Sequence, residues 1–365
     1  MRASGFESMK VDELSDALGV IRGGGGGPSL LMNDHIDHVP LGDMIEPYSG
    51  KLMDSSPFGA TWEVVYGRAA CYMKAGVVAI VMAGAAISGL GIKLRGDLKV
   101  AAVARKETGG AGTIHTIERE HFLTDTVLIG EATNMGLALR HRWTLRASIV
   151  VRGRSCHASI PDRGVNTLYG AADLLRRIRG ELVSALPEYS LYGRSSIAVT
   201  TIEVTSATIN VVPEACRFGI DCRNSSDYPP ERLRDELEAL ICSEKSVNPE
   251  LDASVLLSPL NQGRRVFTVF MTEPDRQPVV GVVENVLAKS LGKAPRRGTW
   301  AFATDGRMYS WMGLPVVGFG LGEKRFAHTV QDHVRVEDYI ASIKAYATVA
   351  CRLLGRNPNH GRTES

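Results

Sequence analysis

The segment that decides the fold is Ser29–Asp37, which has the sequence SLLMNDHID. Its apolar start, Ser29–Met32, is short and follows a run of glycines, a pattern typical of a buried strand in a parallel sheet. His35 and Asp37 come directly after it. Because ligand-binding residues of open α/β sheets gather beyond the carboxyl ends of the strands, we expect His35 to face a site there. Asp37 can accept a hydrogen bond from the imidazole and fix its tautomer.

Segments on both sides of Ser29–Asp37 alternate between strand-like and helix-like patterns. Apolar runs of strand length occur at Val100–Ala104, Thr126–Ile129 and Pro315–Phe319. Segments with helical length and periodicity occur at Met73–Ala86, Val279–Leu291 and Val336–Leu354. This alternation predicts a mainly parallel sheet that is flanked by helices.

The middle of the chain has a different pattern. Apolar and polar residues alternate at Leu145–Val151, Ile197–Val204 and Phe218–Cys222, as they do in half-buried antiparallel strands. Helical periodicity lies between these strands, and 365 residues are too many for one ordinary core. We therefore predict an α/β domain formed by residues 1–144 and 263–365, and an inserted α+β domain over residues 145–262.

Composition argues against several classes of function. With 44% hydrophobic and 22% charged residues, the chain has the composition of a soluble globular protein. The formal net charge is only +2 and no dense basic stripe is present, so nucleic acid is a poor partner. The six cysteines lack C-x-x-C spacing, which favours reduced thiols in a cytoplasmic protein. The uncharged stretch Val77–Leu90 is too short for a membrane span.

Four residues with metal-binding side chains lie near the ends of predicted strands or in loops: His35, Glu107, Glu131 and His328. Glu131 comes directly after an apolar strand, and Glu107 precedes a glycine pair. Imidazole nitrogens and carboxylate oxygens are the ligands that zinc-like ions use. Each residue alone is more typical of an ordinary loop than of a ligand. Their joint occurrence favours a pair of divalent metal ions.

Longer motifs carry a resemblance to a known family. These motifs are Asn33–Asp37 (NDHID), Tyr66–Gly76 (YGRAACYMKAG), Lys106–Gly110 (KETGG), Gly130–Thr133 (GEAT), Ser155–Ser159 (SCHAS), Asn210–Pro213 (NVVP), Thr304–Arg307 (TDGR) and Ala327–Thr329 (AHT). Through them the chain resembles the di-zinc metallopeptidase family 20. This superfamily contains aminoacylase, acetylornithine deacetylase, succinyl-diaminopimelate desuccinylase and glutamate carboxypeptidase. The resemblance extends from Gly5 to Leu354 and is strongest to a branch linked to selenium metabolism.

The resemblance implies a metal-binding catalytic α/β domain with an inserted domain that serves as lid and dimerisation element. It assigns His35 and Glu131 to one metal ion, and Glu107 and His328 to the other. Asp37 would be the acid that orients His35. The implied ions are two Zn²⁺, with Co²⁺ or Mn²⁺ as alternatives.

Three residues of the inserted domain resemble substrate-binding residues of the family. His157 would reach across a homodimer to stabilise the oxyanion, and Asn210 and Arg223 would bind the amide and carboxylate of an N-acyl amino acid or small peptide. The planar guanidinium of Arg223 suits a carboxylate because it can form two parallel hydrogen bonds. A salt bridge on the sheet surface is the alternative interpretation of Arg223.

Two positions depart from the family pattern. Tyr72 stands where the family has an aspartate that bridges both ions, and Lys106 stands where it has the glutamate that acts as general base. A tyrosine offers one phenolic oxygen with a pKa near 10, which is badly shaped to bridge two ions. A lysine is protonated near neutrality unless it is buried, so it would begin as an acid and would oppose metal binding.

Two hypotheses of function remain open. The first is a metal-dependent hydrolase of amide bonds in N-acyl amino acids or small peptides, weakened by Tyr72 and Lys106. The second is a catalytically inactive homologue that keeps the fold and the ligand pocket. In addition, Gly5–Ile21 resembles the part of the family that follows a first long helix. That helix is missing from the sequence, so either the true start lies further upstream or the catalytic domain lacks one packing element. In the second case we expect dimerisation or a rearranged N-terminus to cover the exposed apolar face.

Overall fold

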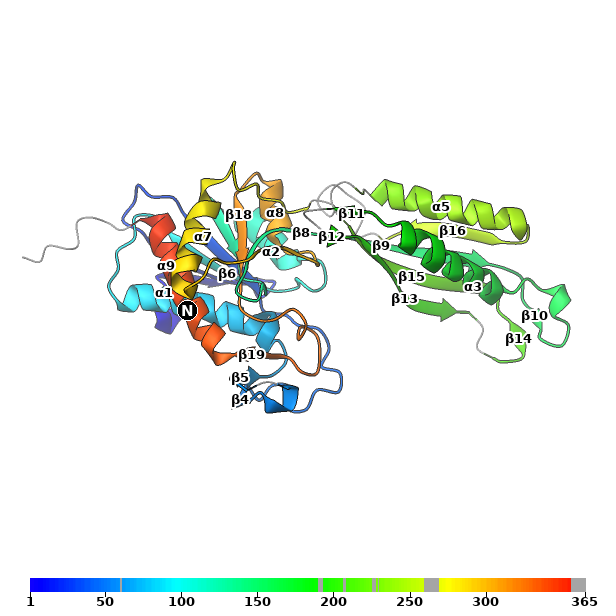
Figure 1. Ribbon diagram of the computed structural model, residues 1–365, viewed down its shortest axis with the longest axis horizontal. Helices are drawn as coiled ribbons and strands as arrows, with labels where there is room; N and C mark the ends of the chain where they lie inside the picture. Colours follow the sequence, from blue (N-terminus) through cyan, green and yellow to red (C-terminus); the bar gives the residue numbers. More distant parts are fainter. Residues whose placement is uncertain are drawn as a thin grey trace, which may run out of the picture. The chain divides into compact units, whose positions relative to one another are not determined.

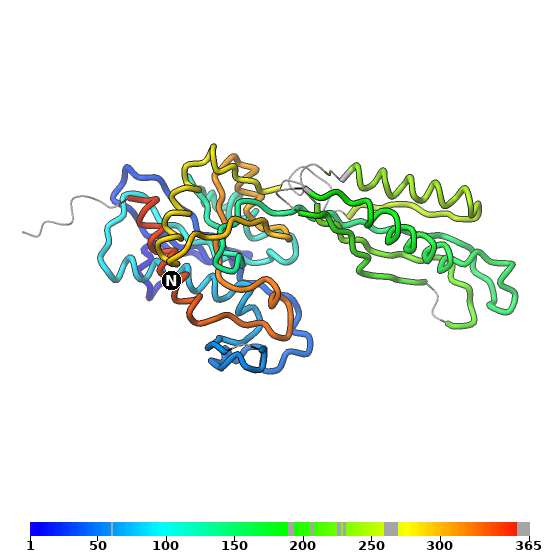
Figure 2. The backbone as a smooth tube through the Cα atoms, in the orientation of Figure 1, coloured from blue at the N-terminus to red at the C-terminus, as the bar shows by residue number. Residues whose placement is uncertain are grey.

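The computed structural model describes residues 1–59, 61–189, 193–205, 208–224, 228, 230–258 and 269–355. The chain forms two compact units. The first contains Met1–Arg140, Phe270–Trp300 and the chain from Thr304 onward, and the second contains His141–Val269 with Ala301–Ala303. Figure 2 shows the first unit in the colours of both chain ends and the second in green. The junction predicted between residues 262 and 263 lies outside the described residues.

The first unit is built on an eight-stranded sheet. Its strands, in order across the sheet, are β1 (Ser8–Val11), β2 (Ala17–Ile21), β6 (Leu98–Val103), β3 (Leu30–His35), β7 (Thr126–Ile129), β18 (Val316–Phe319), β8 (Leu137–His141) and β17 (Arg297–Trp300). The central strands β6, β3, β7 and β18 are parallel to one another, whereas β1, β2 and β8 pair antiparallel with their neighbours. The predicted α/β class with a mainly parallel sheet is therefore confirmed.

Helices cover both faces of this sheet (Figure 1). The helices of the first unit are α1 (Ala75–Gly89), α7 (Pro278–Leu291), α9 (Val336–Leu354), α2 (Ala111–Glu118) and α8 (Gly306–Trp311). Helix α9 packs against both α1 and α7, and the three share a buried core with the strands that includes Leu30, Ile80 and Val349. Helices α2 and α8 contact strands β6, β7 and β18 instead. Burial of apolar side chains between these layers stabilises the unit.

One helical segment, Ala70–Gly89, is long and apolar enough to span a membrane, but 61% of it is buried inside the protein. This burial is typical of a core helix. A separate three-stranded sheet joins β4 (Lys51–Asp54), β5 (Glu63–Tyr66) and β19 (His333–Arg335). Sequence periodicity did not predict this small sheet.

The second unit is an antiparallel sheet with helices. Its strands, in order, are β13 (Ser196–Val204), β15 (Ala215–Asn224), β9 (Trp143–Arg152) and β16 (Asp252–Leu257). Helices α3 (Thr167–Arg177) and α5 (Pro230–Val247) contact the sheet and share a core with it, formed around Leu145, Phe218 and Leu237. A two-stranded ribbon pairs β10 (Cys156–His157) with β14 (Val211–Val212). The predicted α+β character is present, and β16 is a strand that the alternation pattern missed.

The remaining elements are short. They are β11 (Glu188–Tyr189), β12 (Gly193–Arg194), α4 (Val183–Ala185) and the helical turns Arg2–Ser4, Ser56–Phe58, Ala70–Lys74, Pro161–Arg163 and Ile178–Leu182.

Candidate functional site

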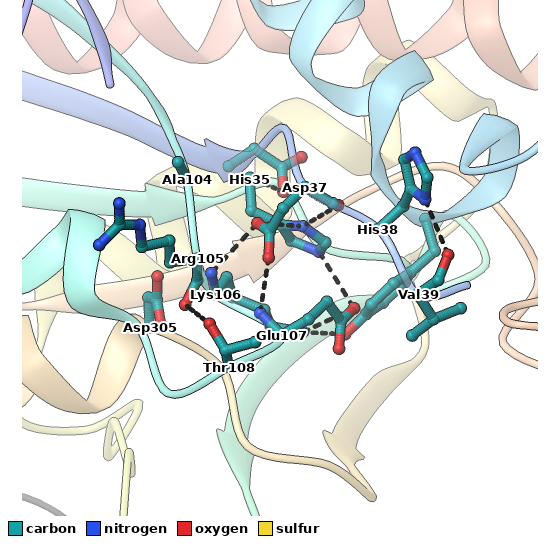
Figure 3. Close-up of polar contacts among 12 residues, drawn as sticks. His35, Asp37, His38, Val39, Ala104, Arg105, Lys106, Glu107, Thr108 and Asp305 are labelled. Carbon is teal, nitrogen blue, oxygen red and sulfur yellow. Dashed lines mark hydrogen bonds and ion pairs between the residues drawn. The ribbon is translucent and has the colours of Figure 1, made fainter. Parts of the chain in front are cut away.

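His35 is the last residue of β3, and its side chain is only 1% exposed. Its Nδ1 lies 2.9 Å from the backbone carbonyl oxygen of Asp37 and 3.4 Å from the carboxylate of the same residue (Figure 3). A ring held in this way donates from Nδ1 and leaves Nε2 with a lone pair. That Nε2 atom is buried and has no hydrogen-bond partner among the described residues. Asp37 thus orients an imidazole whose other nitrogen faces the site.

The Asp37 carboxylate also holds the loop that follows β6. It accepts hydrogen bonds from the backbone N–H groups of Lys106 at 3.1 Å and Glu107 at 2.9 Å. Burial alone would raise the pKa of Asp37, but the hydrogen bonds from His35 and from Glu107 outweigh it and lower the pKa to about 2. The carboxylate is therefore ionised, and it fixes the ends of β3 and β6 relative to each other.

Lys106, Tyr72 and Glu131 form a hydrogen-bonded chain in the centre of the site. The Lys106 ammonium donates to the Tyr72 hydroxyl at 2.5 Å, and that hydroxyl donates to Glu131 Oε2 at 2.5 Å. Lys106 Nζ also lies 3.3 Å from Glu131 Oε2. The side chains of Lys106 and Glu131 are 7% and 2% exposed. A lysine ammonium therefore lies among the groups that were predicted to bind metal.

Burial, followed by the charge of Glu131, raises the pKa of Tyr72 well above its usual value. The phenol is therefore neutral here, and it acts as both hydrogen-bond donor and acceptor. Its ring contacts both predicted metal-binding imidazoles edge-on, with centroids 5.1 Å from His35 and 5.0 Å from His328. The bulk of Tyr72 thus lies beside both histidines.

Glu107 is surrounded by nitrogen atoms. Its Oε1 lies 3.9 Å from His35 Nε2, 3.6 Å from His328 Nε2 and 3.9 Å from Lys106 Nζ. Each distance is too long for a hydrogen bond, and Oε1 is buried without a hydrogen-bond partner in the described part of the chain. His328 lies in a loop and is the more accessible histidine, with 42% of its side chain exposed.

A buried ion pair that sequence analysis missed holds the Tyr72 turn against the His328 loop. The Arg68 and Asp332 side chains are 2% and 1% exposed. Asp332 accepts hydrogen bonds from the backbone N–H groups of Ala69 at 2.7 Å and Cys71 at 2.8 Å, and lies 3.3 Å from Arg68 Nη1. Arg68 also donates to the carbonyl oxygen of Thr329 at 2.8 Å. The available signal was the position of Arg68 inside the motif that contains Tyr72.

The three predicted substrate-binding residues lie in the second unit. His157 is the last residue of β10 and is exposed, and the carbonyl oxygen of Asn210 accepts a hydrogen bond from Ala158 at 2.9 Å. The ribbon thus brings His157 and Asn210 close together. Arg223 instead lies near the end of β15, where its guanidinium binds both carboxylate oxygens of Asp221 at 2.5 and 3.0 Å. This is the surface salt bridge of the alternative interpretation.

Arg223 is also remote from Asn210 within one chain. Asn210 precedes the start of β15 at Ala215, and the eight residue steps from Ala215 to Arg223 span about 26 Å of strand. A single copy of the second unit therefore does not unite these two residues in one binding site.

Glu107 Oε1 lies within 4 Å of both imidazole Nε2 atoms, but the predicted ligands do not form a group of three or more around one point. Among the described residues, the only group of three or more His, Cys, Asp or Glu side chains with ligand atoms within 4.8 Å of one another is Asp12, His115 and Glu120. That group lies outside the predicted site, and its members already have partners: His115 Nδ1 lies 3.1 Å from Asp12, and Glu120 lies 2.5 Å from Lys10. Zinc needs its ligand atoms about 2 Å from one point. The residues of the candidate site do not fit a bridged pair of metal ions.

The central strand β3 ends in His-x-Asp, and acidic residues follow both of its parallel neighbours, β6 and β7. The sequence pattern of Peptidase family M20/M25/M40 matches residues 31–352. The chain therefore belongs to this peptidase family.

Curated relatives cover most of the chain. The uncharacterized protein YgeY of Escherichia coli K12 is 28% identical, over 96% of this chain and 86% of its own length. Succinyl-diaminopimelate desuccinylase of Gluconacetobacter diazotrophicus is 29% identical, over 91% of this chain and 83% of its own. Acetylornithine deacetylase of Myxococcus xanthus is 26% identical, over 97% of this chain and 90% of its own length. The characterised relatives are thus deacylases.

Solved structures share the fold. A tripeptidase from Staphylococcus aureus matches with a TM-score of 0.73 and 18% identity, covering 96% of this chain and 89% of that one. The YXEP protein of Bacillus subtilis, described as a dinuclear metal-binding peptidase from the M20 family, matches with a TM-score of 0.67 and 12% identity. This match covers 97% of this chain and 89% of that one.

Proposed function

We propose that this chain is a homologue of the family's amide hydrolases whose metal-dependent turnover is weak or absent, and that it retains binding of N-acyl amino acids or small peptides. One observation carries the proposal, namely the chain of hydrogen bonds from Lys106 through Tyr72 to Glu131. An ammonium and a neutral phenol stand where amide hydrolysis needs a proton acceptor and a bridging carboxylate.

The other polar groups do not replace the missing base. Glu131 already accepts a hydrogen bond from Tyr72 and faces the Lys106 ammonium, so its Oε2 is engaged. Asp37 is held by two backbone N–H groups and by His35. Of the predicted metal-binding carboxylates, Glu107 has an oxygen, Oε1, that is buried without a hydrogen-bond partner among the described residues. A general base must lie within hydrogen-bond reach of its proton, and this oxygen is surrounded by nitrogens.

Ligand binding is supported by polar atoms that lack an internal partner. His35 Nε2 and Glu107 Oε1 are buried without one in the described part of the chain, and a buried polar atom in this state is costly. Amide N–H groups of a ligand could satisfy them, because both atoms accept hydrogen bonds. The names of the curated relatives support acylated amino acids as the ligand class.

A homodimer is part of the proposal. Strand β13 is at the edge of the second unit's sheet, and its side chains Val199, Ile202 and Val204 are 40%, 55% and 40% exposed. An open edge with exposed apolar side chains can pair with a second copy of the chain.

Metal-dependent hydrolysis of the same substrates is the second candidate. The observation that favours it is the retention of His35 and Glu107 with unpartnered Nε2 and Oε1 atoms 3.9 Å apart. Zn²⁺ is the metal expected for this function, with Co²⁺ or Mn²⁺ as alternatives.

The test is to dialyse the purified chain against trace zinc, measure metal by elemental analysis, and assay hydrolysis of a panel of N-acetyl and N-succinyl amino acids. Binding of the same compounds is measured by isothermal titration calorimetry. We expect binding, fewer than two ions per chain, and turnover near the background rate. Robust turnover that a chelator abolishes would reject the proposal in favour of the second candidate.

A further inference from the structure

The centre of the site contains more buried negative groups than positive ones. The carboxylates of Glu131 and Glu107 have 2% and 18% exposed side chains and lie 3.3 and 3.9 Å from the Lys106 ammonium. An ionised carboxylate inside a protein is strongly unfavourable unless an opposite charge or several hydrogen bonds compensate it. Lys106 Nζ is the cation that both glutamates share.

Tyr72 connects this cation to Glu131 in a way that a carboxylate could not. Its hydroxyl accepts a hydrogen bond from Lys106 and donates one to Glu131. A hydroxyl can do both, whereas an ionised carboxylate only accepts. Lys106 Nζ also lies 4.4 Å from the centroid of the Tyr72 ring, within range of a cation–π interaction. The Tyr72 and Lys106 side chains are therefore complementary: the tyrosine accepts a hydrogen bond from the lysine and passes one on to Glu131.

We infer that the Lys106 ammonium is a built-in cation that takes the place of one divalent metal ion, so that the site is a latent metal site which a single substitution at Lys106 opens. This inference rests on the proposed function, because it explains why turnover would be weak. Unlike the proposed function, the inference predicts that substitution of Lys106 increases metal binding, which can be measured without any enzymatic activity.

The inference predicts opposite responses to zinc. In the native chain, the Lys106 ammonium already occupies the place between the two glutamates. Zinc or a chelator should therefore leave the thermal midpoint unchanged within about 1 °C. In Lys106→Met, the glutamates lose their shared cation. We expect the midpoint to fall by roughly 5 °C without metal, because a buried charge is left unpaired, and to recover when zinc is added.

The experiment compares the native chain, Lys106→Met, Lys106→Gln and Lys51→Met by elemental analysis and thermal unfolding. Lys51 is a matched control because its side chain is 60% exposed and its nearest acid is 3.9 Å away. We expect both Lys106 variants to bind about one zinc ion more per chain than the native protein, and Lys51→Met to bind no more. Metal held elsewhere, for example near Asp12 and His115, cancels in this difference.

Two results would overturn the inference. One is that neither Lys106 variant binds more zinc than the native chain. The other is that the native chain itself binds two ions. Lys106→Gln keeps hydrogen-bond donors at this position, so the comparison survives if Lys106→Met fails to fold. Robust turnover by a native chain that holds one ion would contradict the proposed function. The inference would still be decided by whether the Lys106 variants bind one ion more than the native chain.

Discussion

The candidate residues of the two units differ in how they are held. In the first unit, hydrogen bonds join the largely buried side chains of Tyr72, Lys106 and Glu131, and the buried His35 ring contacts Tyr72. The ion pair of Arg68 with Asp332 holds the turn that carries Tyr72. In the second unit, His157 and Asn210 are exposed on a two-stranded ribbon. Substitutions in the first unit should therefore change stability and metal binding together. Substitutions in the second should change ligand binding alone.

The largest effect is expected for Asp332→Ala. This change leaves the Arg68 guanidinium buried without its counter-charge and frees the N–H groups of Ala69 and Cys71. Removing one partner of a buried ion pair costs about 3–5 kcal/mol of unfolding free energy. Urea unfolding followed by circular dichroism measures it. Glu273→Ala is the control, because its pair with Arg276 is exposed and should contribute less than about 1 kcal/mol. Equal losses in both variants would mean that burial of the pair is irrelevant.

The next effect concerns hydrolysis. Lys106→Glu together with Tyr72→Asp supplies a carboxylate at both substituted positions, and we expect turnover to rise about 100-fold, the lower range for a restored general base. Each single substitution should raise turnover only slightly, because the general base can act only when the bridging carboxylate holds the metal pair. The matched control, Lys106→Gln with Tyr72→Asn, removes the same two side chains without adding a carboxylate. Initial rates on N-acyl amino acids decide the matter, and additive gains from the single variants would contradict the coupling.

A third prediction concerns Asp16, a buried carboxylate that, unlike Asp332, is not paired with an arginine among the described residues. Burial raises the pKa of Asp16 to about 6, although Ala104 donates to it, and the charge of Asp12 adds to the rise. Because the pKa of Asp16 is higher in the folded chain than in the unfolded chain, the folded protein is relatively more stable when this carboxyl is protonated. This contribution to the unfolding free energy is complete below about pH 4 and is lost as the pH rises through 6. Asp16→Asn should thus gain about 2 kcal/mol relative to the native chain between pH 4 and pH 7. Unfolding free energies across this range test it.

The exposed residue Gln331 provides the control for the pH series. Gln331→Asn changes no titratable group, so it should show no pH-dependent difference from the native chain. If Asp16→Asn and the native protein keep the same difference in stability from pH 4 to pH 7, the Asp16 carboxyl does not titrate in this range.

Much of the fold follows from the sequence because burial imposes periodicity. Helix α9 spans the predicted Val336–Leu354, and β7 spans the predicted Thr126–Ile129. The meeting of His35, Lys106 and Glu131 was also predictable, since β3, β6 and β7 are parallel neighbours whose carboxyl ends share one edge.

The hydrogen bonds inside the site could not be predicted in the same way. Whether Tyr72 binds a metal or donates to Glu131 depends on the position of its ring between two histidines, which no pattern encodes. Arg68 and Asp332 are 264 residues apart in the chain, so their pairing depends on tertiary structure. Closeness in sequence does not settle a side-chain pairing either. Asp221, the partner of Arg223, is only two residues away, yet the sequence left both interpretations of Arg223 open.

The smallest effect is expected in the second unit. His157→Ala should change the unfolding free energy by less than about 0.5 kcal/mol, because the side chain is exposed and its only described contact is Nδ1 with Ser159, 2.7 Å from the hydroxyl oxygen. If His157 binds the ligand, affinity for an N-acyl amino acid should fall about tenfold, the loss of one hydrogen bond. Calorimetric titration measures the affinity. His121→Ala, an exposed histidine of the first unit, should change neither quantity. A loss of stability without a loss of affinity would place His157 with the structural residues of the first unit and would remove the contrast between the two.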